Sequence, residues 1–485
     1  MRPYLSFILK NQLNRRYLFT AIAAILLQFI VFKWMYPFGD YFTDSYSYIH
    51  AAANHNKVSF RPIGYSKFLY AVHAVTTSET ALIYIQYLLV QLGALHLFFS
   101  VSYFYRPGKM ARVLLFAVLV CNPVLLYLAN YISSDILFAT LSLFWLLQLL
   151  WLLHRPRFYR LLLLAGLLFL LLQTRFTALY YPLTGIVALL LLRQKYWYKI
   201  TGMALLLSVT VFCVVSVQKT TQAATGTRVF SAFSGWQWAN NALHIYCHTK
   251  PGRDDMPPAC AGIDSFVRRY FDTACPRRIN ASISTDYMWD DNKPLKQYLA
   301  YYRQQKDLGY FNAWHAVAPV YSSYGFYLIK KNPIAYARYY LLPGAKNYLL
   351  PSLEVMTVYN QGVDTVDKAA VYWFRYRSAK VHCVSTHLQQ VLLAPVPAGF
   401  LVVNLLFVTA VGWFLRAKGL RRASPGFSAS LLLAAFFIAL NAVFSIAATP
   451  SAVRYEIFPL LLLACYTLLT FDWLLRHRRQ PAADH

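Results

Sequence analysis

The sequence predicts an all-α polytopic membrane protein with about ten transmembrane helices and a mostly helical external domain. Three observations carry this prediction. Hydrophobic residues make up 58% of the 485 residues, whereas charged residues make up only 13%. Apolar runs long enough to cross a bilayer recur along the chain, which is typical of a polytopic membrane protein rather than a soluble one. One long polar segment, rich in Tyr and Trp, interrupts these runs and predicts the external domain.

The apolar runs are separated mostly by short polar loops. The first is too long for the core of a signal peptide and lacks a small-residue cleavage site, so we expect a retained helix. The fifth run is short, and only Thr174-Arg175 separates it from the sixth. The ten expected spans lie near 17–36, 81–104, 111–131, 135–153, 160–173, 176–193, 199–217, 391–415, 427–448 and 453–474.

Clusters of Lys and Arg indicate the orientation of the chain. They precede the first span and follow the second, fourth, sixth, eighth and tenth spans, so all of them fall on one side. Because short cytoplasmic loops are enriched in Lys and Arg, both termini are expected to be cytoplasmic. This topology accounts for the net charge of +28, and the scattered basic residues do not indicate a nucleic-acid partner.

The predicted topology divides the chain into three parts. Residues 1–217 form an N-terminal transmembrane module whose first external loop, 37–80, is expected to be catalytic. Residues 218–390 form the external domain, and residues 391–485 form the last transmembrane helices and a cytoplasmic tail. Only Asp472 and Asp484 of the 18 acidic residues fall on the cytoplasmic side, so we expect the chemistry to take place on the outer face.

Three aspartates at the outer ends of the spans are the candidate catalytic acids. Asp40 and Asp44 follow the first span, and Asp135 precedes the fourth. A charge at this depth is costly unless it is used or paired, which favours a functional role. Alternatively, Asp40 or Asp44 caps a helix that starts at Ser45, and Asp135, Ser133 or Ser134 caps the fourth span, because Asp and Ser are favoured N-cap residues.

Three arginines at the same predicted level are the candidate phosphate ligands. Arg61 lies in the first external loop, Arg175 in the third, and Arg454 in the last, next to Tyr455. A guanidinium can bind phosphate through two parallel hydrogen bonds. Alternatively, these side chains extend to lipid headgroups, or Arg454 pairs with Glu456.

Four of the seven cysteines, Cys247, Cys260, Cys275 and Cys383, fall in the predicted external segment. An even number in an oxidising compartment predicts one or two disulfides, with Cys247–Cys260 or Cys260–Cys275 as the nearest pairings. A zinc site that uses His244 and His248 is an alternative, although the spacing matches no standard pattern.

The sequence contains no phosphate-binding loop, dinucleotide fingerprint or zinc-protease motif, so a nucleotide-driven machine is not expected. Its pattern resembles the GT-C superfamily of membrane glycosyltransferases, in the branch of protein mannosyltransferases and lipid A aminoarabinose transferases. The likeness covers most of residues 1–220 and returns near the C-terminus. It is carried by Asp44-Ser45-Tyr46, Ala51-Ala52-Ala53, Arg61-Pro62, Tyr65, Asn122-Pro123, Ser134-Asp135, Arg175 with Pro182, Asn332-Pro333 with Tyr336, and Pro450 to Arg454-Tyr455.

The resemblance implies a sugar transferred from a polyprenyl-phosphate donor to a lipid, glycan or protein acceptor, with inversion at the anomeric carbon. Asp44 would be the general base, with Asp40 supporting it or exchanging roles, because the Asp-Glu pair common in the family reads Asp44-Ser45 here. Asp135 would orient the acceptor or help to hold a divalent metal such as Mg or Mn. Arg61, Arg175, Arg454 and Tyr455 would bind the lipid phosphate. We expect a bacterial inner-membrane protein with a periplasmic active site.

Two other functions stay open at this point. An O-antigen ligase or polymerase is also polytopic, and by resemblance it would depend on Arg338, His382 or His387 rather than on Asp44. A flippase or transporter of lipid-linked sugars would line a path with charged residues and would tolerate replacement of Asp44 by Asn.

Overall fold

The computed structural model describes residues 3–249, 251–273, 275, 285–448 and 450–478, in which helices are joined by turns and loops. Within these ranges the only β-type pairings are isolated bridges, and no strand forms. Helices satisfy every backbone hydrogen bond within their own segment, which is the requirement that a bilayer imposes.

Eight helical segments in the described residues are long and apolar enough to cross a membrane, so the chain is a helical membrane protein. They are α2 (Gln12–Met35), α5 (Glu79–Tyr105), α6 with α7 (Lys109–Val120, Pro123–Asn130), α8 (Ser134–His154), α11 (Tyr196–Thr225), α21 with α22 (Thr386–Leu393, Val396–Arg416), α24 (Pro425–Ala448) and α25 (Val453–Arg478).

The fifth and sixth expected spans correspond to shorter apolar helices, so the expected count of ten is not confirmed. The fifth is α9 (Phe158–Thr174), and the sixth is η1 (Phe176–Tyr180) continued by α10 (Tyr181–Leu191). Neither exceeds 17 residues, whereas a helix needs about 20 to cross the hydrocarbon core.

The third span is broken in the middle. Asn122 caps α7 by accepting a hydrogen bond from Val124 N–H, and Pro123 occupies the first turn. The break frees the carbonyl of Val120, which accepts hydrogen bonds from the amides of Gln91 (3.2 Å) and Gln28 (3.5 Å). Polar side chains from two neighbouring helices therefore satisfy the carbonyl that Val124 N–H leaves free when it bonds to Asn122.

The described chain forms two compact units. Unit 1 comprises Met1–Thr210, Leu353–Ala439 and Val453–His485, and unit 2 comprises Val211–Ser352 and Leu440–Ala452. The stretch 353–390, which the sequence analysis assigned to the external segment, belongs to unit 1 by its contacts.

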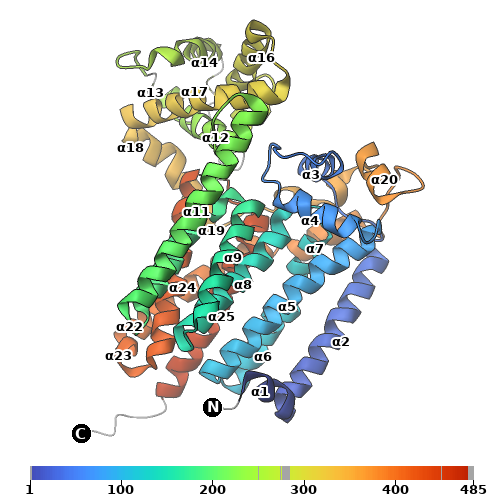
Figure 1. Ribbon diagram of the computed structural model, residues 1–485, viewed down its shortest axis with the longest axis vertical. Helices are drawn as coiled ribbons and strands as arrows, with labels where there is room; N and C mark the ends of the chain where they lie inside the picture. The colour runs from blue at the N-terminus through green and yellow to red at the C-terminus, as the bar shows by residue number, and fades with distance from the viewer. Residues whose placement is uncertain (1–2, 250, 274, 276–284, 449, 479–485) are drawn as a thin grey trace. The chain divides into compact units, whose positions relative to one another are not determined.

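Unit 1 carries several short helices besides its spans. Figure 1 shows α3 (Thr43–Ala53), α4 (Gly64–His73) and α20 (Lys368–Phe374) gathered near the end of α5 that is remote from α1 (Tyr4–Lys10). The remaining short elements of this unit are η5 (Glu354–Thr357), η6 (Tyr359–Gly362) and α23 (Gly419–Arg422).

Unit 2 is built around the crossing of α12 (Ala232–Leu243) and α17 (Tyr310–Lys331). Trp236 and Trp314 stack in its core with ring centroids 3.8 Å apart, and both are almost completely buried. The other elements are α13 (Tyr246–Thr249), η2 (Pro258–Cys260), α14 (Ala261–Thr273), α15 (Asp286–Trp289), α16 (Pro294–Lys306), α18 (Pro333–Tyr336), η4 (Ala337–Leu341) and α19 (Leu342–Leu349).

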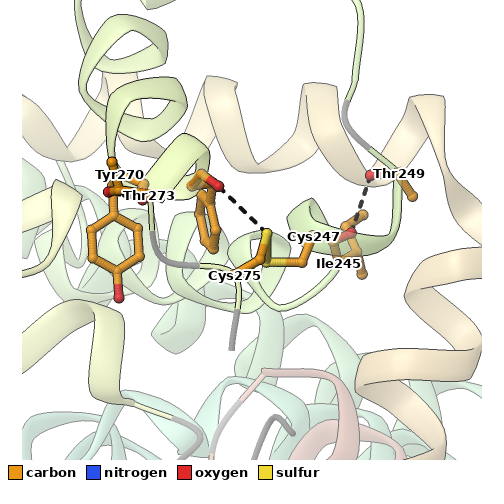
Figure 2. The surroundings of a disulfide bond; sticks show 7 residues. Ile245, Cys247, Thr249, Tyr270, Thr273 and Cys275 are labelled. Atoms are coloured by element: carbon orange, nitrogen blue, oxygen red, sulfur yellow. Dashed lines mark hydrogen bonds between the residues drawn. A yellow bond between two sulfur atoms is a disulfide. The ribbon is translucent and has the colours of Figure 1, made fainter. Parts of the chain in front are cut away.

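One disulfide joins α13 to the chain just beyond α14, between Cys247 and Cys275 (Figure 2). The two pairings expected from sequence are therefore wrong. Cys260 is free because it lies in the core of unit 2, where its thiol faces the carbonyl of Val320 on α17. Cys383 is free as well. Because Cys247 is used by the disulfide, the zinc alternative loses its central ligand.

Candidate functional site

Asp44 lies in the first turn of α3, and its carboxylate is not used to cap this helix. The N-cap is Phe42, whose backbone N–H donates to Ser45 Oγ at 3.2 Å. Neither Asp40 nor Asp44 caps α3, so that alternative is wrong. The Asp44 carboxylate instead accepts a hydrogen bond of 2.8 Å from Arg61, and Nη1 of Arg454 lies 4.0 Å from its other oxygen.

Two opposing effects set the pKa of Asp44. Burial by itself raises the pKa, but the nearby guanidinium groups of Arg61 and Arg454 outweigh burial and hold the pKa below its usual range. Opposite charges within a few ångströms favour the ionised form of a carboxyl group. Asp44 is therefore a carboxylate at neutral pH.

Asp135 occupies the equivalent place in the first turn of α8. Ser133, and not Asp135, caps this helix, and the Ser133 hydroxyl donates to Asp135 Oδ2 at 2.9 Å. The other carboxylate oxygen is paired with Arg175, which follows α9. The Asp135 side chain is only 3% exposed, whereas that of Asp44 is 18% exposed, so Asp44 is the more accessible acid.

Arg454, in the first turns of α25, joins the two aspartates. Its Nη1 lies 3.5 Å from Asp135 and 4.0 Å from Asp44, and its Nε donates to Glu354 at 3.0 Å. Its guanidinium also lies over the ring of Phe42, 5.0 Å from the centroid. One cation therefore connects three acids from three separate parts of the sequence.

Tyr455 lies between two of the cations. Its ring centroid is 4.5 Å from the guanidinium carbon of Arg175 and 4.3 Å from that of Arg454. Cations are attracted to the face of an aromatic ring, and the attraction strengthens away from water. Tyr455 thus holds two positive groups at a spacing that their mutual repulsion opposes.

The structure brings most of the sequence-predicted site residues together within unit 1. Asp44, Asp135 and Glu354 face Arg61, Arg175 and Arg454, which gives three negative and three positive charges. The residues come from the first turns of α3, α8 and α25, from the segment after α9, from the loop before α4 and from η5. Guanidinium groups in such a setting are suited to binding a phosphate or a carboxylate.

Asp40 is placed differently from the other acids. Its carboxylate accepts a hydrogen bond of 2.9 Å from Asn360 N–H, and its backbone pairs with Asn130 and Ile132. Burial raises the pKa of Asp40 to about 7. In the part of the chain that the structure describes, no ion pair joins Asp40 to Arg61, Arg175 or Arg454. Asp40 anchors the segment 353–366 to the first loop and lies outside the ion-pair cluster.

Two members of the site were not predicted from the sequence. Glu354 lies in a polar stretch far from any span, and Phe42 looks like an ordinary interfacial aromatic residue. One signal existed for Phe42, since it directly precedes the helix that carries Asp44. Glu354 gave no local signal, because only the fold brings it to Arg454, which lies 100 residues further along the chain.

The residues present do not form a ready ligand set for the expected divalent metal. No group of three or more His, Cys, Asp or Glu side chains is spaced to hold a metal ion in the described part of the chain. The carboxylates of Asp44, Asp135 and Glu354 each already face a guanidinium. No chemical step at Mg or Mn is therefore proposed.

Within the described residues of unit 1, no ion pair links His382 or His387 of the ligase alternative to this cluster. His382 stacks edge-on against Phe38 in unit 1, with ring centroids 5.2 Å apart. Arg338 belongs to unit 2, where it lies over the ring of the adjacent Tyr339.

Comparison of the chain with family models, with curated proteins and with solved structures found no match.

Proposed function

We propose that this protein is a membrane glycosyltransferase that moves a sugar from a polyprenyl-phosphate donor to a hydroxyl of a lipid, glycan or protein acceptor. The observation that carries the proposal is the convergence of Asp44 and Asp135 with Arg61, Arg175 and Arg454. A transfer of this kind needs a general base beside a phosphate-binding group, and both kinds of residue occur within one cluster.

The three arginines bind the donor phosphate in this proposal. Arg454 is the central ligand because it pairs with both aspartates, and its side chain is 11% exposed. Water is largely excluded from such a group, so its attraction for an anion is weakly screened. The same guanidinium groups stabilise the charge that develops on the phosphate as it departs.

Asp44 is the general base in the proposed reaction. Its carboxylate takes the proton of the acceptor hydroxyl while the acceptor oxygen bonds to the anomeric carbon. The bond from that carbon to the phosphate oxygen breaks, and the phosphate leaves as a monoester with the electron pair. Attack from the face opposite the leaving group inverts the anomeric centre. Asp135, which is more deeply buried, positions Arg175 and Arg454.

The ion pair with Arg61 also makes the basicity of Asp44 depend on whether the donor is bound. A carboxylate whose pKa is lowered by cations is a weak base. When the donor phosphate takes up part of the hydrogen bonding of Arg61 and Arg454, Asp44 loses some of its counter-charge and becomes more basic. In this mechanism the base is fully active only when the donor is bound.

The proposed orientation places the site on the outer, periplasmic face of a bacterial inner membrane. Within unit 1, Asp44 and Asp135 lie at the N-terminal ends of α3 and α8. The basic residues Arg106 and Arg155 follow the C-terminal ends of α5 and α8. The positive-inside rule assigns the basic end to the cytoplasm, with both termini.

The test is transfer of radiolabelled sugar from polyprenyl-phosphate donors to endogenous acceptors in membranes that contain wild type, Asp44→Asn or Asp364→Asn. Asp364 is exposed and lies outside the cluster, so its variant controls for loss of one negative charge. We expect Asp44→Asn to lower transfer by about a hundredfold or more at an unchanged protein level, and Asp364→Asn to keep it. Full transfer by Asp44→Asn would remove this residue from the chemistry. No transfer by wild type from any donor would refute the proposed function.

A further inference from the structure

Glu354 is the least constrained of the three acids in the cluster. Its carboxylate accepts a hydrogen bond of 3.0 Å from Arg454 Nε. The side chain is 27% exposed, compared with 18% for Asp44 and 3% for Asp135. The other two acids are also held by Arg61 and Arg175 respectively, so Glu354 is the acid that an incoming anion displaces most easily.

Hydrogen bonds hold the backbone that follows Glu354, whereas its side chain forms an ion pair with Arg454. The carbonyl of Val355 accepts from the Tyr131 hydroxyl at 2.9 Å, and the carbonyl of Met356 accepts from the Gln389 amide at 2.9 Å. Glu354 itself has a φ of 46°, which is unusual for a residue with a side chain. Local strain of this kind persists only where the surroundings impose it, and it concentrates at functional sites.

Charge counting shows what the site accepts when Glu354 moves away. Asp44, Asp135 and the three arginines then carry a net charge of +1. A phosphodiester-linked sugar donor carries one negative charge and neutralises this set. The phosphate monoester left after transfer carries −1.5 to −2, by analogy with phosphoserine at about pH 7. The proton that Asp44 takes during transfer first raises the charge of the set to +2. Once Asp44 has released that proton to solvent, the set carries +1 again, and the product overfills the site with negative charge.

We propose that Glu354 is an exchangeable internal counter-ion of the lipid phosphate. It occupies Arg454 in the empty site, yields this position to the phosphate of the donor, and returns to help expel the phosphate monoester. The inference rests on the proposed function, because it assigns a role to Glu354 at the same phosphate-binding arginine. It makes Glu354 a positioning residue that sets product affinity and takes no part in proton transfer.

The experiment measures equilibrium binding and dissociation of dodecyl phosphate on the detergent-solubilised full-length chain. Wild type is compared with Glu354→Gln, which keeps the shape of the side chain, and with the exposed control Asp364→Asn. We expect Glu354→Gln to bind the amphiphile about tenfold more tightly and to release it correspondingly more slowly, because the neutral amide competes with the phosphate for Arg454 less strongly than a carboxylate does. A gain in affinity cannot arise from a variant that fails to fold.

The other outcomes separate this inference from the proposed function. Equal affinity of wild type and Glu354→Gln, with Arg454→Gln weakened, would overturn the role of Glu354 and leave the phosphate site intact. Equal tightening in Asp364→Asn would show a general effect of surface charge and would also overturn it. Absence of binding by wild type and by Glu354→Gln would refute the phosphate site itself, and with it both proposals.

Discussion

The guanidinium of Arg61 donates a hydrogen bond of 2.8 Å to the carboxylate of Asp44. The two residues are 17 positions apart, with Asp44 in the first turn of α3 and Arg61 in the loop that follows this helix. The pair ties the entrance of this helix to the loop before α4. It also determines how readily Asp44 takes a proton, because burial alone raises the pKa of this carboxyl group, and Arg61 and Arg454 reverse that effect.

Replacement of Arg61 by Gln is expected to move the acid limb of the transfer activity to higher pH. Arg61 holds the pKa of Asp44 below its usual range, and removal of the charge raises that pKa. The base is then protonated at pH values where the wild-type base is ionised. The measurement is kcat/KM for sugar transfer between pH 4 and 9. Arg61→Lys keeps the charge and should shift the limb less, whereas an unmoved limb in Arg61→Gln would contradict the assignment.

Asp40 is expected to make stability depend on pH. Burial raises its pKa from 3.8 to about 7 in the folded protein. The group therefore contributes stability below its unfolded pKa, and this contribution is lost as the pH rises through about 7. Asp40→Asn does not titrate, so the variant should gain stability relative to wild type between pH 4 and pH 8. Thermal unfolding of both proteins in one detergent at both pH values measures the difference, and a pH-independent difference would refute the prediction.

The disulfide of unit 2 predicts how many cysteine thiols a labelling reagent modifies before and after reduction. Five cysteines are free and two are joined, so the denatured, unreduced chain should label five thiols and the reduced chain seven. Paired replacement of Cys247 and Cys275 by Ser should lower the stability of unit 2 by about 3 kcal/mol, because the unfolded chain gains freedom. Cys260→Ser is the matched control and should leave the labelling difference of two thiols in place. Loss of that difference in Cys260→Ser would contradict the observed pairing.

The spans could be predicted from the sequence because a helix that crosses the bilayer must itself be a long, continuous apolar run. The two expected spans that are not confirmed, α9 and η1 with α10, are the runs of 17 residues or fewer, which are shorter than the roughly 20 residues of a typical bilayer crossing. Length is a local property, but whether a short apolar helix crosses the membrane depends on its neighbours. The boundaries of the well-separated spans differ from the expected ones by five residues or fewer, except that α11 continues to Thr225 rather than ending near 217.

The ion-pair cluster could be predicted in large part for a related reason. Charged residues at the ends of apolar spans on one side must share the same narrow surface, so Asp44, Asp135, Arg175 and Arg454 were expected at one level. The partners within that level were not predictable. Glu354 reaches Arg454 only through the fold of the segment 353–366, and the separate role of Asp40 depends on its contact with Asn360.

The crossing of α12 and α17 gives a last prediction, about the core of unit 2. The two helices approach so closely that a Cβ added at Gly235 would collide with the carbonyl of Ala318, and one added at Gly325 would lie 2.5 Å from the backbone of Trp238. Gly235→Ala and Gly325→Ala should therefore each force the helices apart and destabilise the unit by about 1–3 kcal/mol, despite the better helix propensity of Ala. Gly309→Ala, just before α17, meets nothing within 4 Å and is the matched control. Thermal unfolding of the three variants measures the effect. If Gly235→Ala unfolds at the same temperature as Gly309→Ala, the helices do not cross at the distance described.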